Sequence, residues 1–121
     1  IIKNISFKGA NVKNTITTKE GMIVQDADRL DAIGAVGIGR AFAYGGFMKR
    51  EMYNPDVSHE IHNTFEEYKN KSGSTINHFY EKLLLLKDKM NTKTGKEKAE
   101  KRHEFMCSFL DEFYSEWNGE L

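Results

Sequence analysis

Hydrophobic positions recur at helical spacing in two segments of the C-terminal half. In the first segment, about Thr75–Met90, steps of three and four residues join Ile76, Phe79, Leu83, Leu86 and Met90. In the second, about Gly95–Trp117, the same steps join Ala99, His103, Met106, Leu110, Phe113 and Trp117. Such spacing places side chains on one face of an α-helix. The short turn between the segments predicts an antiparallel helical hairpin that packs along these two faces.

A further long helix is expected nearer the N-terminus, over Met22–Tyr44. Thr17 and Glu20 precede it at the spacing of a capping box, and Gly45-Gly46 is a typical C-terminal stop. Each glycine inside a helix costs about 1 kcal/mol, so the interior glycines need a reason. These are Gly34, Gly37 and Gly39. Either another helix backbone approaches closely, or the helix breaks near Gly34.

These segments indicate an all-α fold with one domain in 121 residues. We expect residues 1–46 to hold a loop and the glycine-rich helix, and residues 74–121 to hold the hairpin. Between them, Phe47–Gly73 contains the only proline and shows no sustained helical period, so it is expected to be a variable loop. One short helix, about Ser58–Tyr68, fits within it.

Composition excludes several classes of partner. Eighteen basic and eighteen acidic residues cancel, which gives no reason to expect a nucleic acid polymer or an anionic membrane. The longest apolar run, Leu83–Leu86, is far shorter than a membrane span. The single cysteine, Cys107, fits a reducing compartment. We therefore expect a cytoplasmic protein.

Three aspartates, Asp26, Asp28 and Asp31, form the densest acidic cluster. On a helix Asp26 and Asp28 point in nearly opposite directions, because two residues turn the chain by about 200°. The face that carries Asp28 otherwise holds apolar and small residues, namely Val24, Ala32, Ala35 and Phe42. A carboxylate on such a face needs a partner. An ion pair with an arginine, a cap on another helix, and a bound metal ion are all compatible with the pattern.

The segment Val24–Gly46 resembles a long signature of small bacterial HD-domain phosphohydrolases. Two further blocks, Ser6–Gly9 and Asn77–Thr92, are similar to the same family, so the resemblance spans nearly the whole chain. In that superfamily a divalent ion is held by a His, a His-Asp doublet and a later Asp in an Ala-Asp-Arg-Leu-like stretch. Ala27-Asp28-Arg29-Leu30 matches this last element. The resemblance therefore implies that Asp28 is a metal ligand.

The resemblance also implies an activity. It implies metal-dependent hydrolysis of a phosphate ester or phosphoanhydride, with Mn, Ni, Fe, Zn or Mg as the ion and a nucleotide as the expected substrate. The enzyme would be a nucleotide pyrophosphohydrolase or a phosphatase. No histidine precedes His59 and no His-Asp doublet occurs. We therefore expect the other ligands upstream of Ile1, in a protein of which this chain is the C-terminal part.

Two alternatives stay open. One is a non-catalytic helical module that keeps the HD fold for regulation or interaction. The other is that the two C-terminal helices form a homo-oligomer.

Five side chains are candidates for binding the substrate. Lys and Arg suit phosphate groups, and the tyrosines lie in blocks that resemble the family. The candidates are Lys8, Arg40, Tyr44, Tyr80 and Lys82. His59 and His62 have the spacing of two metal ligands on one helix face, but no third ligand is near them in the sequence, which favours a solvated loop.

Overall fold

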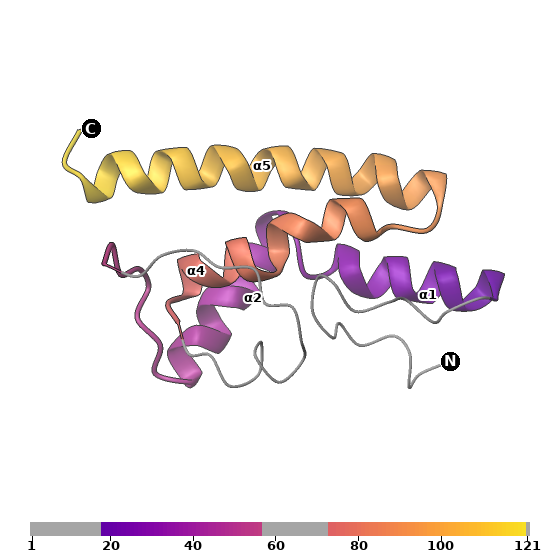
Figure 1. Cartoon of the computed structure of the whole chain (residues 1–121), viewed down its shortest axis with the longest axis horizontal. Helices are drawn as coiled ribbons and strands as arrows, with labels where there is room; N and C mark the ends of the chain where they lie inside the picture. The colour runs from indigo at the N-terminus through magenta and orange to yellow at the C-terminus, as the bar shows by residue number, and fades with distance from the viewer. Residues whose placement is uncertain (1–17, 57–72, 121) are drawn as a thin grey trace.

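The computed structural model describes residues 18–56 and 73–120, and these residues form helices and no strands. In chain order they are α1 (Lys19–Leu30), α2 (Gly34–Phe47), α4 (Thr75–Glu81), the 3-10 helix η2 (Leu83–Lys89) and α5 (Lys93–Trp117). The predicted all-α fold is confirmed. The long α5 helix lies along one side of the molecule, and the other helices pack beneath it (Figure 1). No helix in the described part is long and apolar enough to cross a membrane.

The single helix predicted over Met22–Tyr44 is wrong, and the competing prediction of a break near Gly34 is confirmed. Helix α1 ends at Leu30, and α2 starts at Gly34, whose φ of +78° is costly for any residue with a side chain. Arg102 fixes this break, because its guanidinium donates a hydrogen bond of 2.7 Å to the Leu30 carbonyl. At the other end of α1, Thr18 is the N-cap and accepts a hydrogen bond from the backbone of Gly21. Thr17 lies outside the described residues.

Close contacts explain two glycines of α2. A Cβ on Gly37 would overlap the backbone carbonyl of Ala32, and a Cβ on Gly45 would overlap the hydroxyl of Thr75 on α4. A Cβ on Gly39 would meet nothing within 4 Å. The helix continues through Gly45 to Phe47, so the predicted stop at Gly45-Gly46 is wrong. The left-handed residue that follows α2 is Lys49, with φ of +57°.

The C-terminal hairpin is confirmed, with one difference in its first arm. The predicted helix over Thr75–Met90 breaks at Lys82 (φ −137°) and continues as the 3-10 helix η2. Its five apolar positions are all buried, as their spacing predicts: Ile76, Phe79, Leu83, Leu86 and Met90. Helix α5 begins after Thr92, whose hydroxyl accepts a hydrogen bond of 2.9 Å from the Gly95 backbone. It then runs back over η2 and α2 (Figure 1).

Aromatic side chains fill the space between α2, α4 and α5. Phe42 of α2 lies at the centre, with ring centroids of three other phenylalanines 5.9 to 6.5 Å away: Phe79, Phe109 and Phe113. Tyr53, after α2, extends this cluster to Trp117 near the end of α5. The cluster fixes α2 and α4 against α5. The predicted helix over Ser58–Tyr68 lies outside the described residues, as does most of the variable loop.

Candidate functional site

Among the three aspartates of the acidic cluster, the buried one is Asp26 and not Asp28. Asp26 is only 3% exposed. Its carboxylate accepts hydrogen bonds from the Asn91 backbone (2.8 Å) and side chain (3.0 Å), and from the Thr92 backbone (2.8 Å) and hydroxyl (2.7 Å). Asp26 therefore caps the start of α5, the role that the sequence left open for Asp28.

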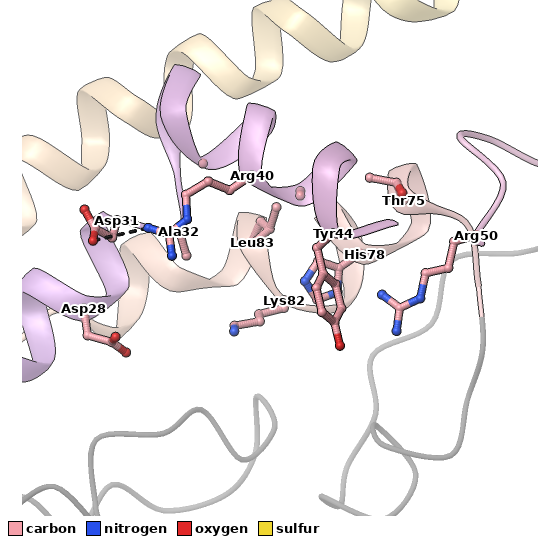
Figure 2. A pocket seen from close by; sticks show the side chains of 12 residues that line it. Asp28, Asp31, Ala32, Arg40, Tyr44, Arg50, Thr75, His78, Lys82 and Leu83 are labelled. Carbon is pink, nitrogen blue, oxygen red and sulfur yellow. Dashed lines mark hydrogen bonds and ion pairs between the residues drawn. The ribbon is translucent and has the colours of Figure 1, made fainter. Parts of the chain in front are cut away.

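Asp28 is exposed, and so is its neighbour on the same helix face, Val24. The prediction that Asp28 lies on an apolar, buried face is wrong, because α1 ends three residues before Ile33 and the small residues of α2 do not continue its face. Asp28 instead points into a cavity between α1, α2 and α4 (Figure 2).

Several contacts hold α1, and with it Asp28, in a fixed position. Besides the Asp26 cap, Arg29 donates a hydrogen bond to the Lys89 carbonyl at the end of η2. Gln25 accepts a hydrogen bond of 2.7 Å from the Asn91 side chain. These contacts join α1 to the turn between η2 and α5. Burial lowers the pKa of Arg29, while Asp26 and Asp28 act in the opposite direction.

The cavity has a volume of about 330 Å³, at the lower end of the size range of ligand sites. Figure 2 shows Asp28 and Asp31 at one end of it and Arg50 at the other, with Lys82, Tyr44 and His78 between. The complete lining is Asp28, Asp31, Ala32, Gly37, Arg40, Ala41, Tyr44, Arg50, Thr75, His78, Lys82 and Leu83. Residues from both halves of the chain thus line this one cavity.

Three cationic side chains reach this cavity from three different places. Arg40 projects from α2 and makes an exposed ion pair of 3.4 Å with Asp31, a contact of little energetic weight. Arg50 follows α2 and lies 5.5 Å from the centre of the Tyr44 ring. Lys82 lies at the end of α4, where burial lowers its pKa and Asp28 partly offsets that effect. A region with three cations suits an anionic ligand.

A histidine, His78, also lines the cavity. Burial, followed by the positive charges of Lys82 and Arg50, lowers its pKa to about 4. The imidazole is therefore neutral near pH 7 and can donate or accept a hydrogen bond through its ring nitrogens.

The structure brings together three of the five predicted substrate-binding residues. Arg40, Tyr44 and Lys82 line the cavity with Asp28. Tyr80 does not line it, because its hydroxyl lies 2.8 Å from the hydroxyl of Tyr114 on α5. Lys8 lies outside the described residues, and so do His59 and His62.

Sequence reasoning missed two residues of the cavity, His78 and Arg50. His78 precedes Lys82 by four residues, so helical spacing alone places both on one face, and this signal was available. Arg50 carries no such signal. Its position depends on backbone contacts after α2, including its own amide hydrogen bond of 2.8 Å to the Gly45 carbonyl.

The described residues do not by themselves form a metal site. Asp28 fits as one ligand, since it is an exposed carboxylate that faces the cavity, and hard divalent ions prefer oxygen ligands. Within residues 18–56 and 73–120, no group of three or more His, Cys, Asp or Glu side chains is arranged to hold an ion. Any complete site would need further ligands from outside these ranges.

Comparisons with known proteins show clear relatives. No family model matches the chain. The chain is 44% identical over 112 residues to the uncharacterized protein YpgQ of Bacillus subtilis, which covers 91% of this chain and 46% of YpgQ. A crystal structure of YpgQ in complex with ADP covers 82% of this chain and 44% of that one, with 42% identity and a TM-score of 0.66.

Two further crystal structures are similar. A protein from Lactobacillus plantarum has a TM-score of 0.88 and 43% identity over 98% of this chain and 56% of its own. An HD-superfamily hydrolase from Bacillus thuringiensis has a TM-score of 0.69 and 50% identity over 84% of this chain and 47% of its own. The chain thus shares an HD-like helical fold with a hydrolase and spans about half the length of these relatives.

Proposed function

We propose that the protein carrying this chain is a metal-dependent phosphohydrolase of the HD superfamily that acts on a nucleotide. The observation that carries the proposal is the cavity between α1, α2 and α4, which combines the carboxylate of Asp28 with three cationic side chains. A carboxylate suits a metal ion and the cations suit phosphate groups. The same cavity therefore offers groups for metal binding and for phosphate binding. The similarity to an HD-superfamily hydrolase and the ADP bound to YpgQ support the same direction.

In this proposal each side chain has a distinct role. Asp28 is one ligand of a divalent ion, held in place because the buried Asp26 fixes α1. A bound divalent ion would supply Lewis-acid polarisation of a phosphoryl oxygen and lower the pKa of a bound water. Lys82 and Arg50 bind phosphate oxygens, and Arg40 can exchange its weak ion pair with Asp31 for a phosphate. The Tyr44 ring, half exposed beside Arg50, forms a wall of the cavity.

The remaining metal ligands are proposed to lie outside the described residues. The resemblance to HD-domain phosphohydrolases implies a histidine and a His-Asp doublet for these positions. Asp28 is then one of four ligands, and its removal should weaken metal binding as well as turnover.

Turnover of nucleoside triphosphates by the protein at its natural length tests the proposal. We expect hydrolysis with Mn²⁺, Ni²⁺ or Mg²⁺, and a loss of at least about 100-fold in Asp28→Asn, because a ligand matters at least as much as the groups that orient it. Asp111→Asn is the matched control, since Asp111 is an exposed carboxylate on α5 outside the cavity. The released product, pyrophosphate or phosphate, identifies the bond that is cleaved.

Two results would contradict the proposal. Activity that survives in Asp28→Asn refutes the ligand assignment. ADP binding without turnover under any of these metal ions refutes the hydrolase and favours a non-catalytic module that retains the fold.

A further inference from the structure

Arg50, His78 and Lys82 line one stretch of the cavity, with Arg50 at the end away from Asp28 and with His78 and Lys82 nearer its middle (Figure 2). His78 lies on α4 and Lys82 is the residue that ends this helix, and the Lys82 amide donates a hydrogen bond of 3.0 Å to the His78 carbonyl. Both cations lie close enough to His78 to act on its charge. The cluster therefore holds two fixed positive charges beside an imidazole.

Backbone contacts fix Arg50 relative to the other two residues. The residues after Arg50 are joined to the start of α4 by two hydrogen bonds, from the Thr75 amide to the Glu51 carbonyl (2.9 Å) and from the Ile76 amide to the Met52 carbonyl (3.0 Å). Gly45 leaves room for Thr75 to approach α2 from the same side. These contacts hold the backbone that carries Arg50 in a fixed position relative to His78 and Lys82.

Charge decides how this cluster responds to a ligand. Burial, and then the positive charges of Lys82 and Arg50, disfavour a proton on His78, so the imidazole stays neutral. A phosphate group bound between Arg50 and Lys82 reverses this balance, because its negative charge compensates the cations and accepts a charge-assisted hydrogen bond from imidazolium.

Four other ionisable side chains line the cavity within residues 18–56 and 73–120. The carboxylates of Asp28 on α1 and of Asp31 just after it lie at the end opposite Arg50, and Arg40 and Tyr44 lie on α2.

We propose that Arg50, His78 and Lys82 bind one phosphate group of the ligand together, and that His78 takes up a proton when the phosphate arrives. The inference rests on the proposed function only for the identity of the ligand as a nucleotide. It makes phosphate binding stronger as the pH falls through the bound-state pKa of His78 toward the free-state value of about 4. The side chain then acts as a proton-linked binding residue for the phosphate chain.

NMR titration of the histidine ring nitrogens, with and without saturating ADP and without a metal ion, tests the inference. The His78 signal is assigned by its disappearance in His78→Gln. We expect the pKa of His78 to rise by roughly one unit or more on ADP binding. The matched reference in the same spectra is His103 on α5, which does not line the cavity and whose pKa should not move.

Three outcomes overturn the inference: a His78 pKa that does not change under saturating ADP, an equal shift of His103, and the absence of ADP binding. As a second variant, Lys82→Met should weaken ADP binding and reduce the shift of His78. Because no turnover is measured, the inference can hold where the hydrolysis assay fails. Hydrolysis with an unmoved His78 leaves the proposed function standing and removes only this inference.

Discussion

Replacing Asp26 by asparagine should destabilise the fold by far more than the same change two residues later. The Asp26 carboxylate, 3% exposed, accepts four hydrogen bonds from Asn91 and Thr92. Asparagine keeps the oxygen that faces Asn91 but places an amide group opposite the Thr92 amide, so two donors meet. The loss of a charged acceptor and one buried N–H left unsatisfied together cost about 3 kcal/mol.

Urea denaturation of the chain, followed by circular dichroism, measures this cost. Asp28→Asn is the matched control, because Asp28 is exposed and its change should alter the free energy of unfolding by no more than about 0.5 kcal/mol. Equal effects of the two substitutions would refute the assignment of Asp26 as the buried cap of α5. A larger effect of Asp28→Asn would also refute it, and would indicate that Asp28 lies on the buried face of α1, as the sequence predicted.

Two further predictions concern α2 and the pH dependence of stability. Gly37→Ala should lower the free energy of unfolding by about 2 kcal/mol, because the new Cβ overlaps the Ala32 carbonyl. Gly39→Ala should raise it by about 0.5 to 1 kcal/mol in the same denaturation assay, because a Cβ there meets no neighbour within 4 Å. The reverse order of the two effects would contradict the packing of α2. His78, whose pKa falls from 6.5 to about 4 on folding, stabilises the fold fully above pH 6.5 and loses this contribution, up to about 3 kcal/mol, as the pH falls to 4. His78→Gln should therefore flatten the decline in stability over that pH range, and an unchanged slope would show that folding does not lower the pKa of His78.

Local patterns predict the C-terminal hairpin well. The apolar steps from Ile76 to Met90 identify the residues that are buried, because any helix with that spacing has one apolar face. The same pattern does not reveal that the chain changes from α to 3-10 geometry at Lys82, since both forms keep these side chains on nearly the same side. The bounds of the long α5 helix differ from the prediction by only two residues at its start.

The N-terminal helices show where sequence reasoning is weaker. The glycines of α2 left a break and a close approach of another helix backbone as alternatives, and the structure contains the break, at Gly34. The backbone close to Gly37 is that of Ala32, in the turn before α2, and not that of another helix. The choice depends on tertiary contacts, such as the bond from Arg102 to Leu30, that link residues 72 positions apart. The face of Asp28 could not be assigned correctly without this break, because the assignment continued one helix through a turn.

Only some residues of the candidate site could be predicted from the sequence. The resemblance pointed to Asp28, and phosphate chemistry and the family-like blocks added Arg40, Tyr44 and Lys82 as candidates. The structure brings these four to one cavity. Arg50 could not be found, because it reaches the cavity only through the backbone path after α2. Tyr80 shows the opposite error, since its position next to Glu81 and Lys82 in the sequence says nothing about which side of α4 it occupies. Its hydroxyl meets Tyr114 on α5.

A crystal structure of the protein at its natural length, soaked with Mn²⁺ and ADP, tests the proposed site most directly. Anomalous scattering locates the manganese independently of the surrounding atoms. The account predicts a manganese peak roughly 2.2 Å from a carboxylate oxygen of Asp28, a distance typical of metal–carboxylate bonds, with the ADP phosphates between Lys82 and Arg50. A manganese peak away from Asp28, or phosphates bound outside the cavity, would contradict it.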